Sequence, residues 1–148
     1  MLTKKTILFV TLAAVLTVGT AIAKNDDFSQ EDLNKLLRGE KNLESVQLEG
    51  ANLSGKNLSG VDFSNADLEY VDFSGANLSG VNFSHADLEK TNLKNADLTN
   101  ANFQYADMEK SNLKGAKITG AKFKNAELEF ATWADGKVCA EDSVGSCW

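Results

Sequence analysis

The chain of 148 residues has room for one domain of ordinary size. Its 21 acidic and 15 basic residues give a net charge of −6. This argues against nucleic acid as a partner, because phosphate contacts need clustered lysine and arginine. An acidic chain is compatible with good solubility or with a basic partner.

Residues 1–23 have the pattern of a secretory signal peptide. Lys4 and Lys5 form a basic start and a mostly apolar stretch follows, before Ala21 and Ala23 supply the small residues that a signal peptidase inspects. We expect cleavage after Ala23, which removes two lysines and leaves a net charge of −8. A membrane anchor is the alternative, but the apolar run is shorter than the about 20 residues that a bilayer span needs. The sequence thus predicts a periplasmic or secreted protein with no stable membrane span after cleavage.

Residues 24–45 are predicted to form an N-terminal capping segment that contains a short helix. Ser29 followed by Asp32 resembles a helix N-cap, and Gly39 offers a stop. The apolar face between them consists of Leu33, Leu36 and Leu37. We therefore expect a helix from about Gln30 to Arg38 that covers the start of the segment after it.

Residues 46–135 divide into 18 consecutive blocks of five without a slip of register. The third residue of every block is Leu, Phe, Met, Ile or Trp, and the second is nearly always Asn or Asp. The first is small or β-branched except at Lys56, and the fifth is often Gly or Asn. Large and small side chains that alternate inward fill a narrow interior, while Gly and Asn tolerate the positive φ of a corner. A repeat of this kind indicates a solenoid.

The blocks resemble those of the pentapeptide-repeat family, whose consensus reads A-(D/N)-L-x-x, over about 70% of the chain left after cleavage. The resemblance implies an all-β fold, a right-handed quadrilateral parallel β-helix in which four blocks form one coil. Here that gives about 4.5 coils. A period of 20 also appears within the sequence, because Phe63, Phe83, Phe103 and Phe123 would stack in one column. We expect the first and third residues of each block to point inward and the second and fourth to point outward.

Residues 136–148 leave the repeat and are predicted to form a C-terminal cap closed by a disulfide between Cys139 and Cys147. Export implies an oxidising compartment, which favours a disulfide. The alternative is a pair of metal ligands, but two thiols without a nearby histidine make a poor zinc site. The segment also resembles the end of exported family members, and Trp133 would plug the last coil. We expect a monomer or a weak dimer, since a cap protects strand edges but some family members dimerise through the C-terminal coil.

The 20-residue period gathers eight carboxylates on one side of the rod, in four stacked pairs. One interpretation is a solvent-exposed face without a ligand, on which Lys90 and Lys110 at adjacent corners reduce the repulsion between carboxylates. The other interpretation is a functional column of carboxylates that binds a basic partner or cations such as Ca²⁺, although no recognised calcium-loop spacing is present. The candidate interaction face consists of Asp67, Glu69, Asp87, Glu89, Asp107, Glu109, Glu127 and Glu129.

The sequence predicts no enzyme and no catalytic, cofactor-binding or metal-binding residues. A filled rod has no cleft, and the only histidine, His85, falls at an outward corner. We expect a protein-binding or envelope-associated module with an unknown partner; a purely structural or stress-related solenoid without a fixed ligand is the alternative. Some cytoplasmic family members mimic DNA and bind DNA gyrase, but the signal peptide places this chain elsewhere.

Overall fold

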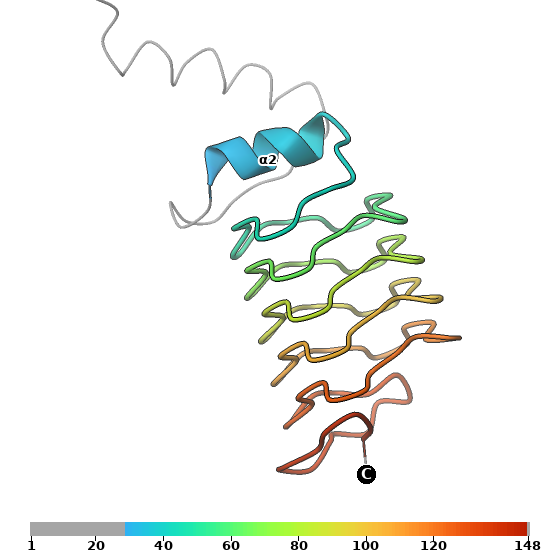
Figure 1. Ribbon diagram of the computed structural model, residues 1–148. Coiled ribbons are helices and arrows are strands. Elements are labelled where there is room, and N and C mark those ends of the chain that lie inside the picture. Colours follow the sequence, from blue (N-terminus) through green and yellow to red (C-terminus); the bar gives the residue numbers. More distant parts are fainter. Residues whose placement is uncertain (1–28, 148) are drawn as a thin grey trace, which may run out of the picture.

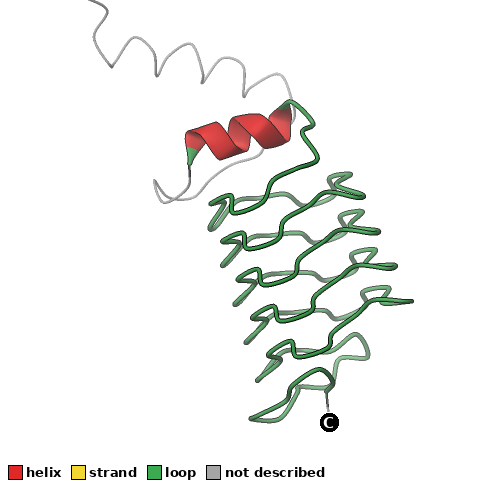
Figure 2. Ribbon diagram, in the orientation of Figure 1, coloured by secondary structure: helices red, strands yellow, loops and turns green. Residues whose placement is uncertain are grey.

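The computed structural model describes residues 29–147, so the predicted signal peptide and its cleavage site after Ala23 lie outside the described residues. Within that range, a helix, α2 (Gln30–Leu37), lies across one end of a stack of rectangular turns (Figure 1). The turns carry no continuous strands and are drawn as loops in Figure 2; isolated bridges link them instead. Among the same residues, no helix has the length and hydropathy of a membrane span.

Every parallel bridge joins the second residue of a block to its counterpart 20 residues later. Asp62 pairs in this way with Asn82, and Asn82 pairs with Asn102. Backbone hydrogen bonds hold each step: the Phe63 N–H donates to the Asn82 carbonyl at 2.7 Å, and the Asn82 N–H donates to the Val61 carbonyl at 3.0 Å. Four blocks therefore separate each residue from the one on which it stacks.

The first and third residues of the blocks fill the interior of the rod, as predicted. The column of Phe63, Phe83, Phe103 and Phe123 is confirmed, with successive ring centroids 5.6, 5.1 and 5.0 Å apart and the rings nearly parallel. Three of these rings are fully buried, and Phe123 is 9% exposed. Stacked aromatic pairs contribute about 0.5–1.5 kcal/mol beyond their buried area, so the column reinforces the register.

The fifth residue of each block from 41–45 to 126–130 adopts a positive φ, which forms the corner, whereas Asp135 in the last block does not. Glycine and asparagine do this as predicted, but bulky residues do so as well. This left-handed conformation costs a non-glycine residue about 1–2 kcal/mol. The stacked backbone thus holds bulky residues at the corners in this conformation as well: Tyr70, Lys90, Tyr105, Lys110 and Phe130.

The rod has four faces, each made of blocks that recur every 20 residues. The asparagine face runs from block 41–45 to block 121–125, and the acidic face from block 46–50 to block 126–130. The third face runs from block 51–55 to block 131–135, and the fourth face from block 56–60 to block 116–120.

Helix α2 is fixed to the first coil by backbone and side-chain contacts. The Ser29 side chain accepts a hydrogen bond from the Asp32 N–H at 3.4 Å, which is the predicted N-cap. Asp32 also accepts from the Gln47 N–H at 3.2 Å, and the Ser29 N–H donates to the Gln47 carbonyl at 3.2 Å. Leu33 is buried, and Leu36 and Leu37 pack partly buried against the core. The helix ends at Leu37, one residue before the predicted end.

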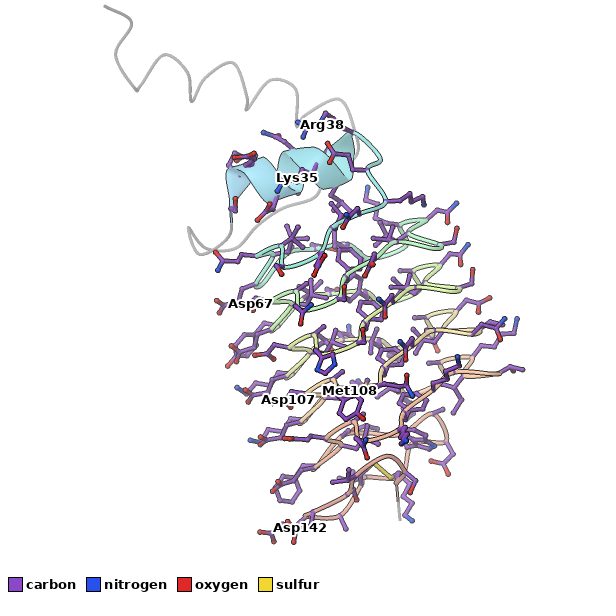
Figure 3. All side chains as sticks on the ribbon, in the orientation of Figure 1. Lys35, Arg38, Asp67, Asp107, Met108 and Asp142 are labelled. Carbon is purple, nitrogen blue, oxygen red and sulfur yellow. A yellow bond between two sulfur atoms is a disulfide. The ribbon has the colours of Figure 1, made fainter. Side chains whose placement is uncertain are left out.

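Beyond the repeat, the tail turns back and pairs antiparallel with the last coil. Val144 pairs with Glu127 on the acidic face, and Val138 pairs with Thr132 on the third face. The predicted disulfide joins Cys139 to Cys147 and appears as the yellow bond in Figure 3. Trp133 is partly buried, with its ring centroid 4.9 Å from that of Phe123.

Candidate functional site

The structure brings all eight predicted carboxylates onto the acidic face. Parallel bridges join Asp67 to Asp87, Asp87 to Asp107 and Asp107 to Glu127, which makes one continuous column. Asp67 and Asp107 mark its position in Figure 3. The four glutamates at the fourth positions of the same blocks lie beside it: Glu69, Glu89, Glu109 and Glu129.

Each aspartate of the column is oriented by its own block. Asp87 accepts a hydrogen bond from the Glu89 N–H at 3.0 Å, and Asp107 accepts one from the Glu109 N–H at 3.0 Å. Asp67 makes a longer contact of 3.4 Å with the Glu69 N–H. These local turns satisfy backbone donors, but they leave carboxylates stacked on carboxylates along the rod.

The corresponding column on the asparagine face is joined by side-chain hydrogen bonds between coils. Asn82 Nδ2 donates to Asp62 Oδ1 at 2.9 Å, and Asn102 Nδ2 donates to Asn82 Oδ1 at 3.0 Å. Burial alone would raise the pKa of Asp62, but hydrogen bonds from Ser64 and Asn82 outweigh it and lower the pKa. Hydrogen bonds from the protein therefore stabilise the charged form of Asp62.

Among residues 29–147, no asparagine side chain of a neighbouring coil donates to Asp67, Asp87 or Asp107, and the pKa of Asp107 is shifted upward instead of downward. Burial raises the pKa of Asp107, and the neighbouring charges of Asp87, Glu89 and Glu109 raise it further. Burial and the nearby Glu109 likewise raise the pKa of Glu129. The face stores like-charge repulsion, which an approaching positive charge would relieve.

Two lysines at one corner of the acidic face neutralise part of it, as predicted. Lys90 Nζ lies 2.6 Å from Glu89 and 3.2 Å from Glu69, and Lys110 forms an ion pair with Glu109. Hydrogen bonds to Glu89 and Glu109 raise the pKa of Lys90 and Lys110, respectively. Exposed pairs of this kind contribute little to stability, because water and salt screen them.

Exposed aromatic side chains border the acidic face, and sequence analysis missed them. Tyr70 is 50% exposed, Phe130 43% and Tyr105 52%. Lys90 Nζ lies 4.6 Å from the centroid of the Tyr70 ring, and the His85 ring stacks on Tyr105 at 4.9 Å. The signal was available, because the 20-residue period that sorted the carboxylates also places these residues at the two corners of the same face.

The remaining chemistry in the described part of the chain is limited. Among residues 29–147, no group of three or more His, Cys, Asp or Glu side chains is arranged to hold a metal ion. The two cysteines are joined to each other.

The family profile described as pentapeptide repeats (8 copies) matches residues 42–80 and 76–115, which together span half of the chain. The chain belongs to the pentapeptide-repeat family. Pentapeptide-repeat proteins fold as right-handed quadrilateral β-helices, so the predicted fold class is confirmed at this level. The 20-residue register described above fits this fold.

Several solved structures of pentapeptide-repeat proteins are similar to this chain. The protein alr5209 from Nostoc PCC 7120 is 30% identical, covers 67% of this chain, is covered over 78% of its own and gives a TM-score of 0.40. AT2G44920, from the thylakoid lumen of Arabidopsis thaliana, is 25% identical, with coverages of 68% and 83% and a TM-score of 0.39. HetL, involved in heterocyst differentiation regulation in Nostoc sp. strain PCC 7120, is 28% identical, with coverages of 66% and 61% and a TM-score of 0.31. No curated protein sequence matches the chain with significance.

Proposed function

We propose that this pentapeptide-repeat protein is an exported, non-enzymatic binding module that uses its acidic face to hold a basic protein or envelope component. The observation that carries the proposal is the column of Asp67, Asp87 and Asp107, in which carboxylates stack without the asparagine donors of the neighbouring face. A rod selected only for stability would gain from asparagine at these positions. Binding of a cationic partner explains why these positions carry carboxylates.

The borders of the acidic face suit the same kind of partner. Exposed aromatic rings are enriched in protein interfaces, and their faces attract lysine and arginine. Lys90 over the Tyr70 ring shows the arrangement within the chain itself. We propose that Tyr70, Tyr105 and Phe130 provide apolar and cation–π contacts around a charged centre.

Export and closed ends complete the proposal. The signal-peptide pattern of residues 1–23 and the disulfide between Cys139 and Cys147 both suit a periplasmic or secreted protein. On this view the mature rod has about 4.5 coils, with helix α2 as its N-terminal cap and the tail as its C-terminal cap. Covered ends favour a monomer or a weak dimer that acts through its sides.

The test compares two variants that lose the same number of negative charges. The first, D87N/E89Q/D107N/E109Q, neutralises the centre of the acidic face. The control, E31Q/E40Q/E44Q/D135N, neutralises four exposed carboxylates away from the acidic face. Each protein is used as bait against the native periplasm or culture medium of its source, at two salt concentrations. Loss of the captured basic proteins with the first variant alone supports the proposal, whereas identical recovery with wild type and both variants overturns it.

A purely structural or stress-related rod is the second candidate, and the lysine pairs favour it. Lys90 and Lys110 already neutralise part of the repulsion without any partner. If the rod is purely structural, the capture experiment with the wild-type protein recovers no specific partner protein. The quadruple variant of the acidic face would then only change stability and solubility.

A further inference from the structure

Tyr70 shows how a cation is held at the corner between the acidic face and the third face. Lys90, one coil later in the same corner column, places its Nζ 4.6 Å from the centroid of the Tyr70 ring. The same Nζ lies 3.2 Å from Glu69 and 2.6 Å from Glu89. Both the negative face of the ring and the charge of the carboxylates attract the ammonium group. This corner therefore binds a basic side chain within the chain itself.

Phe130 stands in the same corner column and also has a ring beside glutamates. It is 43% exposed, and among residues 29–147 no lysine or arginine lies over its ring. Within that range, neither Glu127 nor Glu129 of its own block forms an ion pair, and Lys110 pairs with Glu109. The Phe130 corner thus resembles the Tyr70 corner, but no basic residue of the described chain contacts it.

The tail adds two carboxylates to this end of the acidic face. Burial raises the pKa of Glu129, and the charge of Glu109 raises it further. Glu141 and Asp142 of the tail add to the same rise, so their carboxylates lie close to Glu129. Figure 3 shows Asp142 at the end of the rod, on the side of Asp107. Negative charge is therefore concentrated around the exposed ring.

An exposed apolar side chain lies in the same part of the tail. Val144 is 46% exposed, and its backbone pairs with Glu127 in an antiparallel bridge. The disulfide between Cys139 and Cys147 closes the loop that carries Val144 and both tail carboxylates. A closed loop loses less conformational freedom when a partner binds, so this surface is preorganised.

We propose that this end of the acidic face binds an arginine of a partner protein together with an apolar residue next to it in the partner. The guanidinium group stacks on the Phe130 ring and donates to Glu129 and to the tail carboxylates, as the ammonium group of Lys90 does at Tyr70. Arginine is preferred to lysine because its planar group both stacks on rings and pairs with carboxylates through two hydrogen bonds. The apolar residue contacts Val144. We call this surface the Phe130 corner, and it consists of Glu127, Glu129, Phe130, Glu141, Asp142 and Val144.

The ring, the valine and the charges together select this occupant. A metal ion gains nothing from the ring or the valine, and among residues 29–147 no His, Cys, Asp and Glu cluster is arranged to hold one. A second copy of the chain is disfavoured, because each copy carries a net charge of −6. This inference rests on the proposed function, since the corner belongs to the acidic face, and it specifies the place and the residues that the partner contributes.

The experiment titrates a fluorescein-labelled octapeptide that alternates arginine with valine, and fluorescence anisotropy measures its Kd for the protein. Phe130→Ala should weaken binding by about threefold to fivefold, since the ring no longer holds the guanidinium. Phe130→Tyr keeps the ring and should bind like wild type.

The variant E141Q/D142N should weaken the same peptide by about threefold or more, because it removes two attracting charges. Asparagine tolerates the positive φ of residue 142, so the tail should keep its fold. The matched control E31Q/E40Q loses two charges at the helix end of the rod and should bind like wild type. Unchanged hydrogen exchange at the Leu128 N–H, which donates to Ser143, shows that a variant is folded.

Equal binding of the peptide by wild type, Phe130→Ala and E141Q/D142N would overturn the inference. If the quadruple variant of the acidic face still weakened the peptide, the proposed function would survive that result. Loss of binding with the two corner variants and not with the quadruple variant would support the Phe130 corner and contradict the proposed role of the centre of the face. Equal binding of an octapeptide with serine in place of valine would also overturn the inference, because charge alone would then be recognised.

Discussion

The acidic face and the asparagine face share one backbone geometry and differ in the side chains that they stack. On the asparagine face, amide groups donate from coil to coil and lower the pKa of Asp62. On the acidic face, the same positions hold carboxylates, and the pKa of Asp107 is raised. The repeat thus specifies where a side chain stands, but each column decides whether that position contributes to stability or leaves charge for a partner.

The two faces also differ inside the rod and at its end. Beneath the asparagine face lies the phenylalanine column, whereas Leu68, Leu88, Met108 and Leu128 lie beneath the acidic face. Among the described residues, the tail forms an antiparallel bridge with the last block of the acidic face but none with the last block of the asparagine face. These contrasts predict effects that differ in size and, at the outer columns, in sign.

The largest expected effect is in the interior. Phe103 is fully buried between Phe83 and Phe123, so Phe103→Ala leaves a cavity and breaks two ring contacts. We expect it to lower the free energy of unfolding by about 3–5 kcal/mol. Met108→Leu, at the adjacent interior position of the acidic face, should cost less than about 1.5 kcal/mol. Urea unfolding of both variants checks this, and equal losses would show that the phenylalanine column has no special weight.

Removing the disulfide should have the next largest effect. The loop-entropy relation assigns about 2.5 kcal/mol to the bridge that Cys139→Ser/Cys147→Ser removes. Because the tail pairs with the acidic face, hydrogen exchange should accelerate at the Leu128 N–H, which donates to the Ser143 carbonyl. The Phe123 N–H on the asparagine face has no partner to lose within the described residues and serves as the internal control. Equal acceleration at both amides would mean that the variant has loosened the whole last coil.

Exchanging the outer residues of the two faces should shift stability in opposite directions. Asn82→Asp removes a donor to Asp62 and adds a like charge, with an expected loss of about 1–2 kcal/mol. Asp87→Asn removes a like charge and supplies a donor to the neighbouring carboxylates, with an expected gain of about 0.5–1 kcal/mol at pH 7. Thermal and urea unfolding at neutral pH measure both, and changes of the same sign would contradict the comparison.

The smallest expected effect is a difference in pH dependence. Asp107 has a raised pKa, so the folded protein binds its proton first, and stability rises as the pH falls through that pKa towards 3.8. Asp62 has a lowered pKa, so its contribution is present above 3.8 and is lost as the pH falls below that value. Asp107→Asn should remove the rise in stability at low pH that Asp107 causes. Asp62→Asn should remove the fall in stability at low pH that Asp62 causes. Unfolding free energies measured from about pH 7 to about pH 3 would show this, and parallel profiles for the two variants would refute it.

Much of the fold was predictable because the repeat is regular. The family resemblance implied a 20-residue period, the spacing of Phe63, Phe83 and Phe103 supported it, and the same period placed the carboxylates in one column. The disulfide was predictable because both cysteines lie in a short segment of a chain whose first residues have the pattern of a signal peptide. The function of the acidic face stays a prediction.

Other features depend on contacts that no periodicity encodes. The repeat register places Tyr70 and Phe130 at corners, but the preference of corners for glycine and asparagine does not predict that these bulky residues adopt a positive φ. The stacking of His85 on Tyr105 requires the side-chain rotamers of two successive coils. The path of the tail depends on which edges it pairs with, and residues 136–148 have no repeat to reveal that choice.

The pairing of each residue with the one 20 positions away has a consequence for how such a chain can change in length. Losing a single block would turn every later face by a quarter, so Asp107 would no longer stack on Asp87. Losing four blocks would shorten the rod by one coil, and the residues of every column would still stack. Insertions and deletions of whole coils, 20 residues at a time, should therefore be tolerated best. Other lengths would separate the carboxylates of the acidic column.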